Sequence, residues 1–143
     1  MTPEPSQYPF TPASTRAAVP DAARRFIDRL CDFDVDEAAE GLCEDALLTI
    51  GGQSYAAGKT RVRSALVRAL SLVYSIRCEP AVVWIRRNVA IIEADVDCER
   101  VDRARVAFPL TVTLRFRNHL ISDIRLLTYE PAVTGWFAAS RDH

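Results

Sequence analysis

The sequence lacks the features that mark several large classes of protein. Its 18 lysine and arginine residues are balanced by 19 aspartate and glutamate residues, so the net charge of −1 gives no electrostatic footprint for nucleic acid or an anionic membrane. No apolar run approaches the roughly 18 uncharged residues that a membrane-spanning helix needs. The N-terminus has no basic segment followed by an apolar one, as a secretory signal would. We therefore expect no nucleic acid or membrane partner and a cytoplasmic location.

Cysteine and histidine are also scarce, which limits metal and acid–base chemistry. The four cysteines show no C-x-x-C spacing and lie within apolar runs, where free thiols usually act as small core residues. They are Cys31, Cys43, Cys78 and Cys98. The histidines are His119, in a predicted turn, and His143. The segment GGQSYAAG lacks the glycine spacing of a phosphate-binding loop. We expect no metal and no cofactor.

Proline is unevenly distributed and divides the chain. The first 20 residues hold five of the eight prolines, which remove backbone donors and disfavour a helix or a central strand. We predict an extended arm at residues 1–19, one domain at residues 20–131 and a tail at residues 132–143. The apolar fraction of 49% and the length of 143 residues suit one domain with its own core.

Hydrophobic periodicity predicts three helices. Apolar residues recur at three- and four-residue spacing in residues 20–33 and 59–73. An aspartate cap and a later glycine suggest a short helix within residues 34–45. The predicted strands are residues 46–50, 75–86, 88–101, 104–117 and 120–130, with a loop at 51–58. Helices followed by a run of antiparallel strands indicate an α+β fold in which helices cover one face of a curved sheet.

Alternation within two predicted strands identifies the covered face. Along residues 88–101, Ile92, Ala94, Val96 and Cys98 share one face with Arg100, and acidic residues occupy the other. On the next strand the inward residues are Val106, Phe108, Leu110, Val112, Leu114 and Phe116. The two faces together predict an apolar-lined concavity with an arginine at its end.

The stretch DCERVDRARV, residues 97–106, joins these two strands and admits two interpretations. Arg100 and Asp102 are either part of an active site or part of a solvated hairpin turn. If Arg100 and Val106 face each other, the connection has an odd number of residues, such as 102–104. That register keeps Arg100 at the rim of the concavity and places Asp102 in the turn.

Three segments carry a resemblance to a known family. They are RRFIDRLCDFDVDEAAEGLCEDALLTI, AAGKTRVRSALVRAL and FPLTVTLRFRNHLISDIRLLTYEP. In their order and spacing they resemble the nuclear transport factor 2-like superfamily over residues 20–131. This superfamily includes ketosteroid isomerases, SnoaL-like cyclases and limonene-epoxide-hydrolase-like enzymes. The resemblance implies a cone-shaped, curved, mixed or antiparallel sheet with three N-terminal helices that cover an apolar pocket.

The catalytic positions of two of these enzyme groups map poorly onto this chain. The resemblance places the two oxyanion donors and the base of the ketosteroid isomerases at Phe26, Val112 and Ile50, which have no polar side-chain atoms. Because that chemistry needs a carboxylate and two acidic donors, the mapping excludes it.

The epoxide hydrolases of this fold use an Asp–Arg–Asp relay with a tyrosine and an asparagine. The motif ERVD resembles the arginine and one aspartate of that relay, at Arg100 and Asp102. The other aspartate falls at Leu126, and the tyrosine and asparagine fall at Leu48 and Ile50. The match therefore leaves an arginine–aspartate pair that is either catalytic or structural.

The outward face of the sheet carries a mixed polar and apolar set. It comprises Thr111, Thr113, Arg115, Asp123, Arg125, Leu127 and Tyr129. Because members of the superfamily often pair through this face, the resemblance implies a homodimer.

Three functional hypotheses remain open. The first is binding of a small hydrophobic molecule, with Arg100 at the rim contacting a polar or anionic group. The second is an isomerase, cyclase or epoxide-hydrolase-like enzyme on a polyketide-, terpene- or steroid-like substrate, with Arg100 as electrophile and Asp102 as base. The third is a non-catalytic dimeric interaction module with a filled core. The predicted pocket residues are Phe26, Leu30, Leu48, Ile50, Tyr55, Trp84, Val112, Leu114, Phe116 and Leu126. A cavity of a few hundred Å³ beside Arg100 would favour the first two.

Overall fold

The computed structural model describes residues 11–12 and 18–128, so most of the predicted arm and all of the predicted tail lie outside the described residues. The helices are α1 (Ala18–Cys31), α2 (Val35–Glu40) and α3 (Lys59–Leu70). The strands are β1 (Thr11–Pro12), β2 (Leu42–Ile50), β3 (Gln53–Ala57), β4 (Val73–Arg86), β5 (Val89–Arg100), β6 (Arg105–Arg117) and β7 (Leu120–Leu127). The predicted α+β class and the order of its main elements are confirmed.

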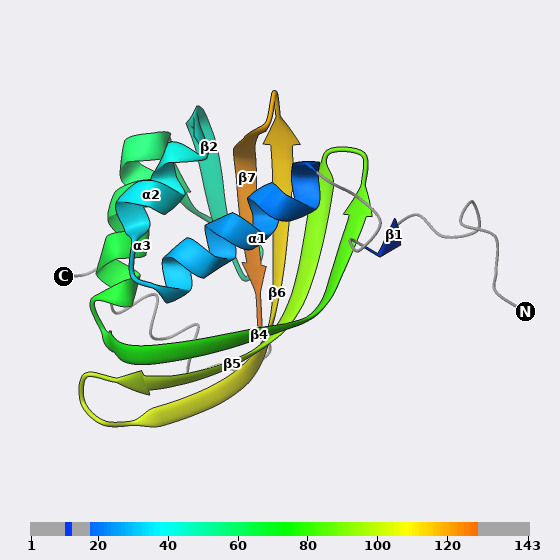
Figure 1. Ribbon diagram of the computed structural model, residues 1–143. Coiled ribbons are helices and arrows are strands. Elements are labelled where there is room, and N and C mark those ends of the chain that lie inside the picture. The colour runs from blue at the N-terminus through cyan, green and yellow to red at the C-terminus, as the bar shows by residue number, and fades with distance from the viewer. Residues whose placement is uncertain (1–10, 13–17, 129–143) are drawn as a thin grey trace, which may run out of the picture.

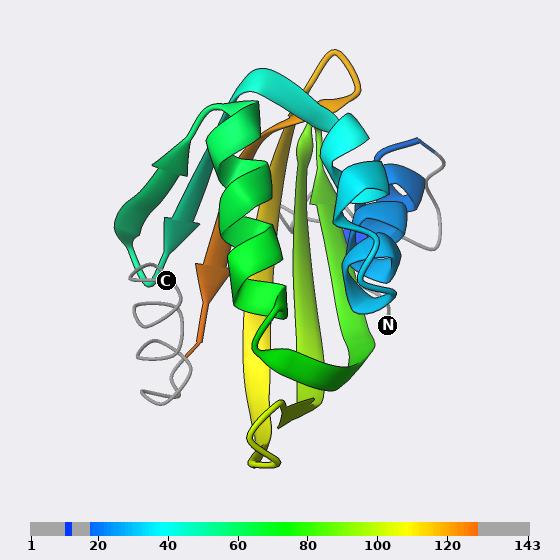
Figure 2. The same ribbon diagram turned by 90° about the vertical axis from the view of Figure 1, so that its left-hand side faces the viewer.

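All seven described strands form one sheet in the order β1-β4-β5-β6-β7-β2-β3. Neighbouring strands are antiparallel except β2 and β7, which are parallel, so the sheet is mixed. The long strands β4, β5 and β6 bend strongly, and the helices lie on the concave side (Figures 1 and 2). Here α1 contacts β4 and β5, whereas α3 contacts β2 and β3. The sheet is a half-closed cone with the helices filling its opening.

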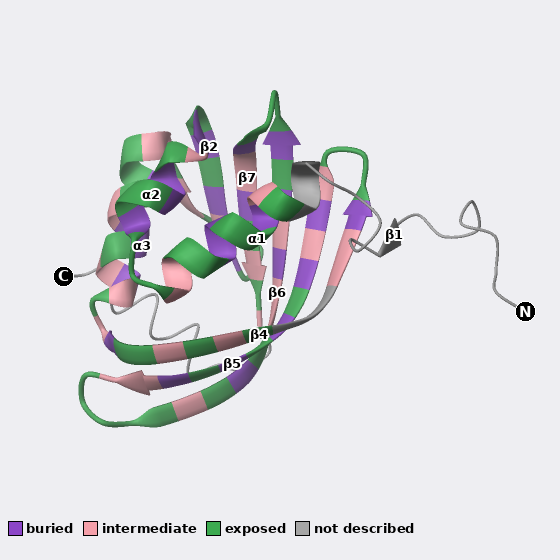
Figure 3. Cartoon of the chain, in the orientation of Figure 1, coloured by how far each residue is buried: buried purple, intermediate pink, exposed green. Residues whose placement is uncertain are grey.

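Alternation along β5 and β6 is as the sequence predicts. Ile92 pairs with Val112, Ala94 pairs with Leu110, and these residues face the helices. Figure 3 shows buried and exposed residues alternating along these strands. Because side chains of a strand alternate between faces, this register assigns every residue of β5 and β6 to the core or to the convex surface.

The second helix and the strand after it differ from the prediction. Asp34 caps α2 as expected, accepting a hydrogen bond from the backbone N–H of Glu37 at 3.3 Å. The helix ends at Glu40, however, and β2 begins at Leu42 instead of residue 46. The Gly41 N–H bonds the carbonyl of Ala38, and Leu42 pairs with Ile121 of β7. Pairing with a distant strand therefore overrides the local helical pattern.

The predicted loop at residues 51–58 is also wrong, because it contains strand β3. Ile50 pairs with Gln53 across a two-residue turn in which Gly51 and Gly52 have φ values of 59° and 82°. Positive φ at both central residues is the geometry of the tight hairpin turn that matches strand twist, and glycine adopts it without strain. The segment is therefore an edge hairpin next to α3.

Candidate functional site

An apolar cavity lies between α1, α3 and the concave face of the sheet. Its volume is about 110 Å³, and every lining side chain is apolar or a cysteine. The lining residues are Phe26, Ile27, Leu30, Cys31, Leu66, Ala69, Leu70, Ile76, Cys78, Val96, Cys98, Phe108, Leu110, Val112, Ile124 and Leu126. Four of the predicted pocket residues are among them, namely Phe26, Leu30, Val112 and Leu126.

The cavity is smaller than the sequence led us to expect. At about 110 Å³ it is of the order that admits one small aromatic or aliphatic molecule, whereas drug-sized ligands occupy roughly 300 Å³ or more. The side chains of Ile27 and Leu66, on α1 and α3, project into the same space. The concavity is therefore partly filled by the helices that cover it.

Several predicted pocket residues lie elsewhere. Leu48, Ile50 and Leu114 are buried in the packed core and do not line the cavity. Tyr55 is half-buried on β3, where it packs against the edge of that core. Phe116 lines a separate groove beside the β6–β7 turn. These five positions thus contribute to packing or to another surface.

Trp84 lies on the opposite face of the sheet from the one predicted. It pairs with Ile91, whereas its neighbour Ile85 is buried and pairs with Ala90 on the concave side. The register of β4 and β5 shifts between Pro80 and Val82, so the strand gains one residue at that point. A β-bulge of this kind reverses the face of every later side chain.

Arg100 and Asp102 lie in the β5–β6 hairpin, and neither lines the cavity. The backbone N–H of Arg100 bonds the carbonyl of Ala104 at 2.8 Å, so the turn comprises residues 101–103. Val106 pairs with Cys98 and not with Arg100. The predicted turn at residues 102–104 is therefore one residue too late in the sequence. Arg100 and Val106 still share the concave face, as expected.

The side chain of Asp102 forms a hydrogen bond within the β5–β6 turn. Asp102 Oδ1 accepts a hydrogen bond from the Ala104 N–H at 3.1 Å, and its Oδ2 lies 3.6 Å from Arg100 Nη2. The side chain of Asp102 is 58% exposed and that of Arg100 is 30% exposed. Arg103 has a φ of 73°, the left-handed conformation typical of the last position in a three-residue hairpin loop. The geometry accounts for Asp102 as a turn-forming residue.

A charged groove that the sequence analysis did not identify runs between α1, α2 and the β6–β7 turn. It has a volume of about 300 Å³ and is lined by Arg25, Arg29, Glu37, Glu40 and His119 among other residues. His119 lies in the turn with a φ of 69° and is exposed, as predicted for a turn residue. In the sequence, the i, i+4 spacing of Arg25 and Arg29 indicates that the two arginines share one face of the first helix. Both cations and carboxylates line the groove, so it favours neither an anionic nor a cationic ligand.

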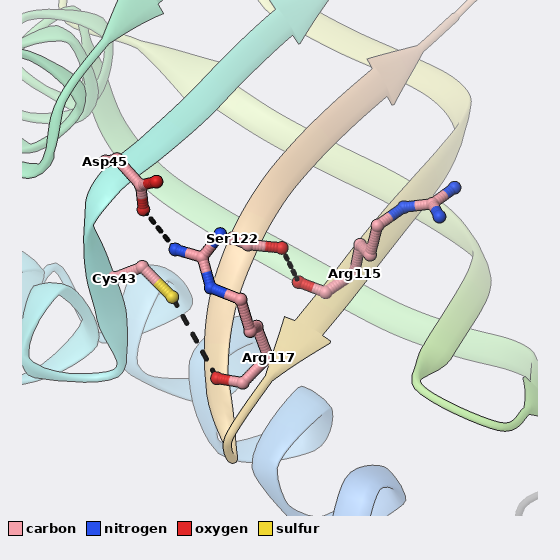
Figure 4. A network of polar contacts seen from close by, with 5 residues as sticks. All are labelled: Cys43, Asp45, Arg115, Arg117 and Ser122. Carbon is pink, nitrogen blue, oxygen red and sulfur yellow. Dashed lines mark hydrogen bonds and ion pairs between the residues drawn. The ribbon is translucent and has the colours of Figure 1, made fainter.

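A polar network fixes the adjoining edges of β2, β6 and β7 (Figure 4). Arg117 forms an ion pair with Asp45, whose carboxylate raises the pKa of the Arg117 guanidinium. Cys43 Sγ lies 4.0 Å from the carbonyl of Arg117, and the Ser122 hydroxyl donates to the carbonyl of Arg115 at 3.2 Å. Asp45 on β2 therefore pairs with Arg117 at the end of β6, across the intervening strand β7.

Three cysteines line the wall of the cavity. They are Cys31 at the end of α1, Cys78 on β4 and Cys98 on β5, and all three are free thiols. Their spacing in the sequence does not indicate this grouping, because it depends on how α1 packs against the sheet. Within the described residues no group of three or more potential ligands could hold a metal ion, and no helix is long and apolar enough to cross a membrane.

Comparisons with known proteins identify the fold. No protein-family model and no curated protein sequence matches the chain. A nuclear transport factor 2-like protein of unknown function from Burkholderia pseudomallei has a TM-score of 0.74 at 12% identity, covering 85% of this chain and 98% of that one. A Mycobacterium tuberculosis epoxide hydrolase of the limonene-epoxide-hydrolase-like type has a TM-score of 0.70 at 17% identity, covering 86% and 90%.

A third solved structure, assigned as a SnoaL-like polyketide cyclase from Shewanella putrefaciens, has a TM-score of 0.73 at 14% identity. The alignment covers 89% of this chain and 90% of that one. The three structures share one architecture, but the first has no known function and the other two carry different assigned activities. At these identities the likeness establishes a common fold and leaves the activity to be argued from the residues of the site.

Proposed function

We propose that this chain, which has the nuclear transport factor 2-like fold, binds a small apolar molecule in the cavity between α1, α3 and the sheet. The observation that carries this proposal is the cavity lining, which contains only apolar side chains and thiols. Apolar surface transferred out of water favours binding in proportion to its area, and no buried polar group here would have to lose a partner. The matching ligand is a hydrocarbon or small aromatic compound.

Binding is favoured over acid–base catalysis by the same lining. It includes no carboxylate, imidazole, phenol or ammonium group that could move a proton at a bound molecule. The relay resembling that of the hydrolases retains Arg100 and Asp102, and the latter is engaged with the backbone of its own turn. We therefore expect a ligand of this cavity to be bound and released without any chemical change.

Arg100 retains a role at the rim in this proposal. It follows Cys98 on the concave face of β5, and Cys98 lines the cavity. A ligand longer than the cavity would extend past Cys98 toward the guanidinium, which is 30% exposed. A polar or anionic end on that ligand would then meet a positive charge, and its apolar body would stay in the cavity.

A titration of the isotopically labelled protein with benzene, followed by methyl NMR, tests the proposal. The expected result is saturable shifts of cavity methyl groups such as those of Leu30 and Val112. Ala69→Leu adds about three carbon atoms on the cavity wall and should abolish saturation. Val67→Leu, on the exposed face of the same helix, is the matched control and should bind like the wild type. Saturation that survives Ala69→Leu would reject the proposal.

We further propose that two copies pair through the convex face of the sheet. Leu127 and Leu47 are 45% and 44% exposed there, so this face presents two large apolar side chains to solvent. Leu127 pairs with Thr111, and Arg125 pairs with Thr113, so the predicted outward residues within the described range share one surface. Apolar side chains flanked by charges are typical of an interface core with a polar rim.

A further inference from the structure

The charged groove between α1, α2 and the β6–β7 turn is a second hollow that the function proposed above does not use. Among the described residues it shares only Phe26 with the apolar cavity. Its volume of about 300 Å³ lies at the lower end of the range for small-molecule sites. The groove is therefore a candidate site independent of the cavity.

The floor of the groove is formed by Phe116 and Ile121, which are buried and held in place by backbone hydrogen bonds. The Ile121 N–H donates to the carbonyl of Gly41 at 2.7 Å, which joins the end of α2 to β7. The Phe116 N–H donates to the carbonyl of Asn88 at 2.7 Å, and the side-chain amide of Asn88 donates to the carbonyl of Phe116 at 2.8 Å. The end of α2 and the β6–β7 hairpin thus form a fixed base.

The two helices beside this floor contribute side chains of opposite charge. Arg25 and Arg29 of α1 line the groove, and so do Glu37 and Glu40 of α2. The spacing of four residues on α1 and three on α2 places each pair on one face of its helix. All four side chains are exposed. Because α1 packs directly against α2, a cationic helix face and an anionic one border the same hollow.

These opposite charges do not neutralise each other. Within the part of the chain that the structure describes, none of the four side chains forms an ion pair or a hydrogen bond, with the other helix or with the acidic residues elsewhere on α1. Ion pairs do form close by, since Arg63 of α3 pairs with Asp36, the residue before Glu37. The cations and carboxylates of the groove are therefore too far apart to pair directly and are available to a ligand.

The β6–β7 turn adds an imidazole to the groove. Asn118 and His119 are the two residues between the paired Arg117 and Leu120, with φ values of 53° and 69°. Glycine is strongly preferred at the second position of such a turn, because it adopts positive φ without strain. Histidine occupies this position instead, and its side chain lines the groove together with Arg25. An imidazole there can donate a hydrogen bond to a ligand carboxylate.

We propose that this groove binds a small zwitterion of the dipeptide type, with its carboxylate at the arginines of α1 and its ammonium group at the glutamates of α2. A ligand with only a negative charge is repelled by Glu37 and Glu40, and one with only a positive charge is repelled by Arg25 and Arg29. A ligand with both charges meets a complementary group at each end. Each guanidinium can hold the carboxylate through two parallel hydrogen bonds.

The distance between the ligand's two charges follows from the same geometry. The protein's own cations and carboxylates are too far apart to pair, so a ligand that bridges them needs separated charges. The termini of an extended dipeptide are at most about 7 Å apart, whereas the charges of a single α-amino acid are adjacent. A dipeptide of small residues also fits within about 300 Å³. We therefore expect alanylalanine to bind more tightly than alanine.

An NMR titration of the labelled protein with alanylalanine at low ionic strength is the primary test. The expected result is saturable shifts of the methyl groups of Ala22, Ala38 and Ile121, which line the groove, while Leu30 and Val112 in the cavity stay unshifted. N-acetyl-alanylalanine keeps only the carboxylate and alanylalanine amide keeps only the ammonium group, so each should bind about threefold more weakly or worse. Equal affinity of the three compounds, or no saturable shift in the groove, would overturn the proposal.

Variants assign each end of the ligand to its helix. Arg29→Gln should weaken alanylalanine and its N-acetyl derivative about threefold and should not weaken the amide. Glu40→Gln should weaken alanylalanine and the amide by a similar factor and should not weaken the N-acetyl derivative. Arg61→Gln on α3 and Glu79→Gln on β4 remove exposed charges outside the groove and are the matched controls. A groove variant that weakened all three compounds equally would contradict the assigned ends.

The cavity variant described above separates this site from the proposed apolar one. Ala69→Leu fills the cavity between α1, α3 and the sheet, and Ala69 does not line the groove. We expect this variant to lose benzene binding and to bind alanylalanine with the affinity of the wild type. Loss of alanylalanine binding in Ala69→Leu would place the dipeptide in the cavity and reject the groove as its site.

Discussion

Cys98 pairs with Val106 across the β5–β6 hairpin, and this single register decides how the charged stretch between them is used. It brings the carbonyl of Ala104 to the N–H of Arg100 and leaves three residues for the turn. Asp102 is one of them, and its carboxylate bonds the backbone of the turn. What resembles half of a hydrolase relay in the sequence is a hairpin with an arginine on its concave side.

Asp102→Ala is accordingly expected to lower the free energy of unfolding by about 1 kcal/mol, because a side-chain-to-backbone hydrogen bond of the turn is lost. Asp102→Asn keeps an oxygen that can accept from Ala104 and loses only an exposed ion pair, so it should cost less than about 0.5 kcal/mol. Urea unfolding measures both. If Asp102→Asn abolished ligand binding while leaving stability intact, the turn assignment would be incomplete.

Gly52→Ala should destabilise the protein by about 1 kcal/mol, because Gly52 has a φ of 82°, where a Cβ is strained. An added Cβ would meet no atom within 4 Å, so the cost is conformational and not steric. Gly41→Ala is the control. Its φ is −81° and its Cβ would meet the Ala38 carbonyl oxygen at an ordinary 3.5 Å. Equal losses in thermal unfolding for the two variants would contradict the tight-turn geometry of the β2–β3 hairpin.

Leu127→Arg should convert the proposed homodimer to a monomer, because it places a new charge on the convex face at a large apolar residue of the proposed interface. Val67→Arg, which changes a similarly exposed apolar residue on α3, should leave the assembly unchanged. Light scattering coupled to size-exclusion chromatography measures the mass of each. A monomeric wild type, or a Leu127→Arg variant that remains dimeric, would exclude this interface.

Alkaline pH should destabilise the folded state through Cys98. Burial raises its pKa above the ordinary value of 9.0, so the unfolded chain releases this proton at a lower pH than the folded chain does. The stability that this difference contributes is present below pH 9 and is lost as the pH rises toward the folded-state pKa. Between pH 9 and 10.5 the wild type should therefore lose more free energy of unfolding than Cys98→Ala, in parallel denaturant titrations. Parallel curves would show that Cys98 has an ordinary pKa in the folded state.

The fold could be predicted from the sequence wherever one pattern dominated. Strict alternation in β5 and β6 fixed the concave face from Ile92 to Phe116, because a period of two leaves one choice of face. The same rule failed for Trp84, since the register shift after Pro80 reverses the alternation and leaves no local signal. The helical pattern failed in turn at Leu42, which pairs with Ile121 and begins β2.

The candidate site could be predicted only in part, for a related reason. Phe26 and Val112 were placed in the cavity because each faces inward on its own element. The volume of the cavity depends on how closely α1 packs against β4 and on how far Ile27 and Leu66 enter the space. Neither quantity is encoded in the periodicity of a single helix or strand.

Nuclear Overhauser contacts between bound benzene and the methyl groups of the protein test the central claim most directly. We expect contacts with Leu30, Ala69 and Val112, which surround the cavity from α1, α3 and β6. Contacts confined to Ala22 and Ile121 would place the ligand in the charged groove instead. That result, or no saturable contact at all, would contradict a ligand-binding cavity beneath the helices.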